Sequence, residues 1–309
     1  MIFTITLSPT FDLTYHVDNL VTDQVNRVGR KIFEPSGKGI NVSIDLAEEQ
    51  FQTLAIAPVP ESELGELWIS AASEKMLIAT SKSGHEIRIN TSIIGKTGVT
   101  KINENFEKLS SDELKDLVGV IEKEATEHKP KWIALCGSVH LENAEALGQA
   151  LRRICDSVGA KLAIDTSGEA AEILFKFSPD FIKPNRDEIS VWYPEAASSD
   201  QALISSIQDL AKRINGTVLC TNGGKTAYAS NNKNLLEIVP PTIAAVNSVG
   251  AGDASLAGFL AAESSGSDFV TAVSMAMMWA IASCQNSKSA GLNLKAASGA
   301  SASIKELVQ

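Results

Sequence analysis

Short apolar runs and amphipathic stretches alternate over most of the second half of the chain. The runs are rich in aliphatic residues and predict buried strands. The predicted strands are residues 132–135, 162–164, 181–182 and 218–219. Between them, residues 144–157 and 201–214 space their apolar positions as helices do. This alternation is typical of an α/β fold with a doubly wound, mainly parallel sheet and helices on both faces.

Two earlier segments have a different pattern. Residues of about 13–35 and 86–103 alternate β-branched and polar positions, with Gly and Asn at turns such as 95–98. They predict a small second sheet that projects from the main body as a lid. The chain has no internal repeat and no low-complexity linker. We therefore expect one α/β domain over residues 1–309, with the lid segments inserted in it.

Polar signatures follow the predicted strands. They are Cys136-Gly137-Ser138, Asp165-Thr166-Ser167-Gly168, Lys183-Pro184-Asn185 and Thr221-Asn222-Gly223-Gly224. In parallel sheets, functional groups gather outside the carboxyl ends of the strands. The sequence therefore predicts a site at that edge of the sheet.

The stretch from Asn247 to Ser255 carries the strongest chemical signal. Gly250 and Gly252 allow a tight turn, and good helix formers follow, so the backbone amides of Gly250, Ala251 and Gly252 are expected at a helix N-terminus. Such amides, together with the helix dipole, bind phosphate. Asp253 has two interpretations: a helix cap that satisfies free amides, or a base beside the bound anion. The local pattern does not choose between them.

A second cluster, from Ser36 to Ser43, again places glycines before a helix and adds a lysine, Lys38, in the turn. Lysine and amides together can hold an anion, although a glycine turn with a solvated lysine has the same pattern. With Arg27, Arg88 and Lys101, this cluster forms a basic set in or beside the lid. The sequence thus predicts a local anion site.

Other nucleotide and metal motifs fail on spacing. Gly224-Lys225-Thr226 ends like a P-loop, but position 219 is Leu219 and not glycine. Gly250 and Gly252 lack the third glycine of a dinucleotide fingerprint, because position 255 is Ser255. The four histidines share no helical or strand spacing, which gives a metal cluster or a histidine triad little support.

Charge and cysteine usage further limit the partners and the structural sites that the protein can have. The chain has 27 basic and 37 acidic residues and a net charge of −10, which argues against nucleic acid and anionic membranes as partners. An anionic substrate therefore depends on the local basic set. The four cysteines are scattered without a CxxC pair, so neither a zinc site nor a disulfide framework is expected.

The amino-terminal residues 1–7 lack a basic region and a cleavage site, so they are expected to form a first strand and not a signal peptide. Residues 269–287 carry no charge, but polar residues interrupt the apolar run. We expect a buried helix there and no membrane span, and we expect the protein to be cytoplasmic.

Taken together, six motifs in this order resemble the ribokinase-like phosphofructokinase B family of carbohydrate kinases over nearly the whole chain. They are Ser36 to Val42, Arg88-Ile89-Asn90, Gly137-Ser138, Asp165 to Glu169, Lys183 to Glu188 and Asn247 to Asp253. Within the family, the sequence is most similar to the branch with 1-phosphofructokinase and tagatose-6-phosphate kinase. That branch shares the Thr6-Leu7-Ser8-Pro9 opening with Asp12, and the stretch from Val25 to Val28.

The resemblance implies transfer of phosphate from ATP to a hydroxyl of a ketohexose monophosphate, fructose 1-phosphate or tagatose 6-phosphate, with Asp253 as the base. The implied anion cradle is Gly250, Ala251 and Gly252. Implied substrate contacts are Asp12, Arg27, Gly37, Lys38, Asn41, Arg88, Asn90, Lys101 and Ser138. Implied ATP contacts are Lys183, Asn185, Glu188, Thr221, Gly223, Ser248, Gly250 and Gly252, and Glu188 is implied to hold Mg²⁺ through water. The lid would close over the sugar and join a second subunit in a homodimer.

The chain departs from the family pattern at Ser36, Ile87 and Thr226, where the family usually has glycine, threonine and glycine. These changes leave the base and the cradle intact. Two alternatives stay open: a kinase for a non-phosphorylated sugar or a nucleoside, and a non-catalytic sensor of sugar phosphate with the same fold. The basic set argues against the first, because a neutral acceptor does not compensate the desolvation of three cations.

Overall fold

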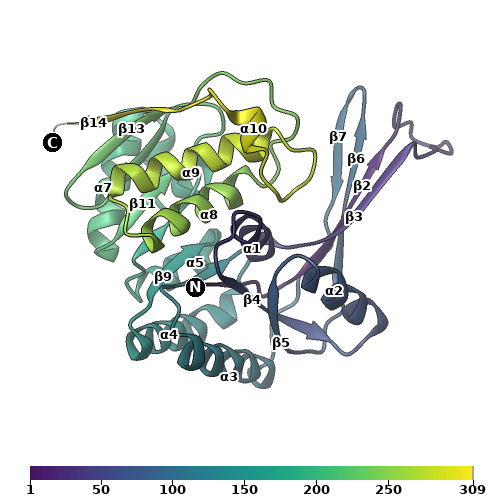
Figure 1. The fold of residues 1–309 in the computed structure, drawn as a ribbon, viewed down its shortest axis with the longest axis horizontal. Helices are drawn as coiled ribbons and strands as arrows, with labels where there is room; N and C mark the ends of the chain where they lie inside the picture. Colours follow the sequence, from purple (N-terminus) through teal and green to yellow (C-terminus); the bar gives the residue numbers. More distant parts are fainter. Residues whose placement is uncertain (308–309) are drawn as a thin grey trace.

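The computed structural model describes residues 1–307, which form a large sheet and a small one (Figure 1). The large sheet has ten strands, and its order departs from the order along the chain at β1. In spatial order the strands are β14 (Ser303–Leu307), β13 (Leu235–Val239), β12 (Ala227–Ser230), β11 (Thr217–Cys220), β10 (Phe181–Ile182), β9 (Lys161–Asp165), β8 (Trp132–Cys136), β1 (Ile2–Ile5), β4 (Thr53–Pro60) and β5 (Leu77–Ser83). From β5 to β11 every neighbouring pair is parallel, and β12 to β14 add an antiparallel edge.

Helices cover both faces of this sheet. They are α1 (Lys38–Glu48), α2 (Glu63–Ser73), α3 (Ser111–His128), α4 (Leu141–Val158), α5 (Gly168–Phe175), α6 (Arg186–Trp192), α7 (Asp200–Ile214), α8 (Ala251–Ser264), α9 (Phe269–Cys284) and α10 (Leu294–Ala297), with a 3₁₀ turn, η1 (Pro194–Ala197). Strand side chains alternate between the two faces. Trp132 and Ala134 pack with α8 and α9, whereas Ile133 and Leu135 pack with α3 and α4. These alternating contacts build one core on each face.

The small sheet, called the lid sheet below, extends away from the body on one side (Figure 1). Its order is β3 (Arg30–Ser36), β2 (Thr10–His16), β6 (Arg88–Gly95) and β7 (Gly98–Ile102). Strand β2 pairs with β3 in antiparallel and with β6 in parallel orientation. The lid is anchored where Phe11 is buried in a cluster with α1 and α2. The molecule therefore consists of a layered α/β body with a small sheet attached to it.

The predicted fold class is confirmed, including the second sheet. The strands expected at 132–135 and 218–219 extend by one residue or two, to Trp132–Cys136 and Thr217–Cys220. The uncharged stretch forms helix α9, in which Trp279 is buried. Between residues 1 and 307, no helix has both the length and the apolarity required to cross a bilayer.

Candidate active site

A cavity of about 600 Å³ opens at the carboxyl ends of the parallel strands, between the body and the lid sheet. It collects the polar signatures because β8 to β11 all end at this edge. Of the residues predicted for the site, those lining the cavity are Asp12, Gly37, Lys38, Asn41, Arg88, Asn90, Ser138, Lys183, Asn185, Glu188, Thr221, Gly223, Ser248, Gly250, Ala251, Gly252 and Asp253. The structure therefore brings together segments from across the chain.

Helix α8 begins at this cavity with an unusual turn. Gly250 has a φ of 87°, and a Cβ atom built on it would lie 1.9 Å from the carbonyl oxygen of Ser289. Only glycine fits there without moving the neighbouring loop. No side chain caps this helix, so its first amides, at Ala251 and Gly252, remain free for an anion.

Asp253 lies in the first turn of α8, but its carboxylate does not cap the helix. Its Oδ2 accepts a 2.9 Å hydrogen bond from Nδ2 of Asn41 on helix α1. The side chain is buried, and burial raises the pKa of Asp253 to about 6, with Lys38 acting in the opposite direction. The carboxylate therefore faces the cavity with a pKa close to neutral pH, as a proton acceptor requires.

Two lysines meet at one buried carboxylate behind the cavity. Lys38 Nζ lies 3.4 Å from Oδ1 of Asp165, and Lys183 Nζ lies 3.5 Å from its Oδ2. Burial favours the neutral acid, but the two ammonium groups hold the pKa of Asp165 below its ordinary value. The Asp165 carboxylate in turn raises the pKa of Lys38. Lys38 therefore stays charged beside the free amides of α8, and the Lys183 ammonium is close to Gly252.

Arg88 and Asn90 of β6 line the lid side of the cavity. Arg88 donates from Nε to Ser8 Oγ at 2.7 Å and from Nη1 to the carbonyl of Glu104 at 2.8 Å, which fixes its guanidinium at the base of the lid. Asn90 lies two residues further along β6. Its Oδ1 is buried and has no hydrogen-bond partner in the part of the chain that the structure describes, so it is available to a ligand.

Two predicted cations lie elsewhere. Lys101, on β7, lines an adjoining cavity of about 430 Å³ beneath the lid sheet, which shares Asp12 and Asn90 with the first. Arg27 is exposed in the loop between β2 and β3 and lies outside both cavities. Within a single copy of the chain, the basic set is therefore divided between two cavities and the tip of the lid.

On the opposite side, helix α6 presents the Asn185 and Glu188 pair. The two residues form a capping box: Asn185 Oδ1 accepts from the amide of Glu188, and Glu188 Oε2 accepts from the amide of Asn185, both at 2.8 Å. Among the described residues, the other Glu188 oxygen has no hydrogen-bond partner, and the side chain lines the cavity. A carboxylate with one oxygen free, beside phosphate-binding amides, fits a water-bridged Mg²⁺.

Helix capping differs between this edge of the sheet and the rest of the molecule. Side chains cap α2, α3, α4, α6, α7, α9 and α10. Within residues 1–307, the α-helices without a side-chain cap are α1, α5 and α8, and their N-cap residues Gly37, Ser167 and Gly250 all line the cavity. The free amides therefore converge where an anion has to be held.

Sequence reasoning missed two residues of this site. Asp165 was part of a recognised signature, yet nothing in the sequence pairs it with both lysines. Ser36 was part of a predicted anion cluster and a departure from the family pattern, but no role was predicted for its hydroxyl, which lies 2.9 Å from Asp12 Oδ2 and 3.2 Å from Asn41 Oδ1. A buried acid at the end of a central parallel strand was the available signal for Asp165.

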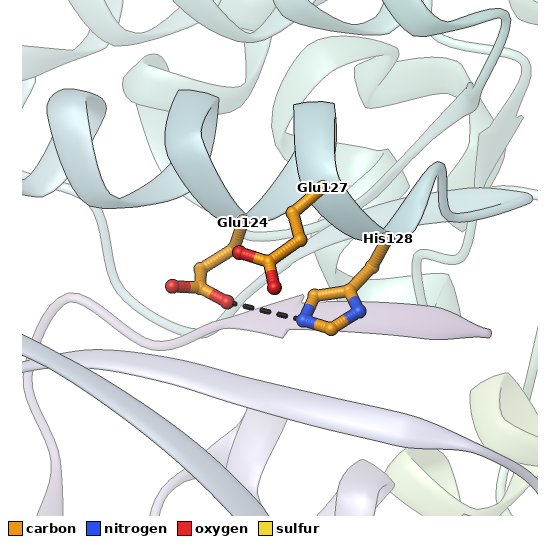
Figure 2. A group of neighbouring side chains, drawn as sticks. All are labelled: Glu124, Glu127 and His128. Carbon is orange, nitrogen blue, oxygen red and sulfur yellow. Dashed lines mark ion pairs between the residues drawn. The ribbon is translucent and has the colours of Figure 1, made fainter.

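A separate cluster lies at the end of α3, where Figure 2 shows Glu124, Glu127 and His128 side by side. Sequence spacing gave little support to any histidine cluster, but positions 124, 127 and 128 share one helix face. The contact drawn is an ion pair of 3.4 Å between His128 Nε2 and Glu124 Oε2. Glu127 and His128 are exposed, and exposed groups of this kind are common without a metal, so we assign the cluster no role.

A doubly wound body, a lid sheet, and a buried carboxylate beside uncapped helix amides fit a phosphotransferase with an alcohol group as acceptor, the class to which the following family match points. Residues 5–296 match the model of the pfkB family carbohydrate kinase. The match spans nearly the whole chain, which therefore belongs to the pfkB family, whose sugar kinases use ATP.

Known proteins with phosphofructokinase names are similar to this chain along most of their length. The chain is 28% identical to 1-phosphofructokinase of Bacillus subtilis over 84% of this chain and 85% of that protein. It is 27% identical to 1-phosphofructokinase of Rhodobacter capsulatus over 91% of this chain and 89% of that protein. The crystal structure of phosphofructokinase-2 from Escherichia coli in complex with substrates and products has a TM-score of 0.84 at 22% identity and covers 94% of this chain and 95% of its own, which supports the fold.

Proposed function

We propose that this kinase transfers the γ-phosphoryl group of ATP to a hydroxyl of a ketohexose monophosphate and releases ADP and the bisphosphate. The observation that carries the proposal is the Asp253 carboxylate, which is buried and free of any capping role beside the uncapped start of α8. The similarity to proteins named 1-phosphofructokinase favours fructose 1-phosphate as the acceptor, with tagatose 6-phosphate as the alternative.

In this proposal Asp253 takes the proton of the acceptor hydroxyl as the oxygen attacks the γ-phosphorus. The amides of Ala251 and Gly252, together with Lys38 and Lys183, stabilise the charge on the transferred group. Phosphoryl transfer asks a protein mainly for positioning and charge stabilisation, so few groups suffice. Mg²⁺, when bound near Glu188, supplies further charge neutralisation on the phosphate oxygens.

On the acceptor side, Asp12, Asn41 and Asn90 orient the sugar hydroxyls. Arg88 and Lys101 bind its phosphate, and Arg88 is suited to this because a planar guanidinium can bind two phosphate oxygens at once. On the donor side, Asn185, Thr221, Gly223 and Ser248 contact ATP. Closure of the lid sheet over both substrates excludes water, which otherwise competes as acceptor.

The lid is also our proposed dimer contact. Its hairpin tip exposes Leu20, Val25 and Val28, and Val25 is 84% exposed, which is unfavourable for apolar side chains unless a partner covers them. Val25→Asp should shift the sedimentation profile towards monomer, and an unchanged profile contradicts lid-mediated dimerisation.

A coupled assay with Mg²⁺ and ATP over a panel of acceptors tests the activity. The panel contains fructose 1-phosphate, tagatose 6-phosphate, fructose 6-phosphate, free fructose and a nucleoside. We expect the highest kcat/KM with a ketohexose monophosphate. Preference for a neutral acceptor would favour a kinase for free sugars or nucleosides, and measurable binding without any turnover would favour a sensor.

A further inference from the structure

Ser36, the last residue of β3, lies between two polar side chains of the cavity. Its hydroxyl is 2.9 Å from Oδ2 of Asp12 and 3.2 Å from Oδ1 of Asn41, and the residue is only 4% exposed. Both neighbours are acceptors, whereas a hydroxyl has one hydrogen to donate. Ser36 can therefore make a full hydrogen bond to only one of them at a time, and in this structure the shorter contact is to Asp12.

Asn41 continues this chain of contacts to Asp253. Its Nδ2 donates to Asp253 Oδ2 at 2.9 Å, so its Oδ1 points back towards Ser36. If the amide turned over, an oxygen would face the carboxylate and the hydrogen bond would be lost. A donor at Oδ1 therefore favours the orientation in which Asn41 stabilises the charged form of Asp253.

We propose that Ser36 is a positioning residue that couples occupancy of Asp12 by the acceptor to the orientation of Asp253. When a substrate hydroxyl donates to Asp12, that carboxylate no longer depends on Ser36. The Ser36 hydrogen then turns to Asn41 Oδ1 and locks the amide, which holds the Asp253 carboxylate in place. This inference rests on the proposed roles of Asp12 and Asp253.

Charged groups of other elements also face Asp253. They are Lys38 and Asp45 on α1, Asp165 at the end of β9, and Lys183 after β10, and the titratable thiol of Cys136 at the end of β8 lies beside them. Ser36 makes no hydrogen bond to any of these side chains in the described part of the molecule. A change at Ser36 therefore reaches Asp253 through Asn41, while the neighbouring charges stay as they are.

The test is Ser36→Ala, with kcat and KM for both substrates measured from pH 5 to 9. We expect kcat to fall about fivefold, as for the loss of one hydrogen bond, with little change in the KM for ATP. The acid limb of the kcat profile should move to higher pH by about half a unit, because Asn41 no longer favours the charged carboxylate as strongly. Ser36→Thr, which keeps the hydroxyl, should restore both properties.

Ser43→Ala is the matched control, because it removes another buried hydroxyl, on α1, that contacts Thr4 and Thr53 and not the cavity. It should lower thermal stability without moving the acid limb. If Ser36→Ala does not fold, Ser36→Gly removes the same hydroxyl together with Cβ. An unmoved acid limb in Ser36→Ala, or in Ser36→Gly where the alanine variant does not fold, overturns the inference, even when kcat falls.

Failure of the proposed function has a different signature. If Asp253→Asn keeps full turnover, Asp253 is not the base, and the coupling falls with it. If Asp253→Asn loses turnover while the Ser36 variants behave as wild type across the pH range, only the coupling is wrong. The two sets of variants therefore separate the two failures.

Discussion

The two sides of the cleft are built differently. The body side places Asp253, Asp165 and Lys183 at the ends of buried elements, and all of them are less than 10% exposed. The lid side rests on a sheet whose strand β7 is exposed at every residue and whose tip carries Arg27 in solvent.

With the roles proposed above, the groups for the chemical step are held by the packed core. The groups that recognise the acceptor instead depend on a sheet with few buried contacts. Substitutions on the body side should therefore mainly lower kcat, and substitutions on the lid side should mainly raise the KM of the acceptor, except at Ser36, which contacts Asn41 of the body. The predictions below test this division.

The largest effect is expected at Asp253. Asp253→Asn keeps the shape of the side chain but removes the proton acceptor, so kcat should fall by at least about 10²-fold. ATP binding, measured by calorimetry, should stay nearly intact because the α8 amides are unchanged. Unchanged turnover would show that the carboxylate has only a structural role, and the division between the two sides would lose its main support.

On the lid side, Arg88→Ala should raise the KM for the phosphorylated ketose by about 10- to 100-fold, the cost of losing a charge-assisted pair. The kcat should change much less. Arg88→Lys is the matched control, since it keeps the charge but loses the planar fork. Equal losses with free fructose would contradict phosphate recognition and would point to the contacts of Arg88 with Ser8 and Glu104 instead.

The pH profile should report the ionisation of Asp253 on the body side. Burial raises the pKa of Asp253 to about 6, and the base acts only when it is deprotonated. Turnover should therefore be near its plateau at pH 8, half of it near pH 6, and about tenfold lower at pH 5. A profile that stays flat down to pH 5 contradicts a base with this pKa.

The smallest effects are expected at the outer cations. Lys101→Ala should raise the KM of the sugar phosphate by about twofold to fivefold, because an exposed ion pair contributes little. Arg27→Ala should have no effect on KM in a monomer and an effect similar to that of Lys101→Ala in a lid-mediated dimer. Measuring KM at low and high protein concentration distinguishes these cases.

Much of this architecture was predictable because it depends on local patterns. Aliphatic runs and helical spacing identified the strands near 132, 162, 181 and 218, and the residues that follow them line the cavity. The free amides of α8 were also predictable, since two glycines before a helix are a short-range signal.

The rest depends on tertiary contacts. Local sequence could not decide between a capping and a cavity-facing Asp253, since position N3 of a helix is compatible with both. The partner that decides it, Asn41, is 212 residues away. The ion pairs of Asp165 with Lys38 and Lys183 likewise form only when β9, β10 and α1 come together in the fold.

The close approach of Gly250 to Ser289 has a consequence for sequence drift. A Cβ atom at position 250 would lie 1.9 Å from the carbonyl oxygen of Ser289. The turn before α8 and the loop that contains Ser289 are therefore in direct contact, and their sequences cannot change independently. An insertion between Cys284 and Leu292 would displace the backbone that bounds the α8 turn, even though no side chain of the cavity is altered. Lineages that vary the later loop in length are therefore expected to change the phosphate cradle as well, and libraries that diversify either loop should vary both together.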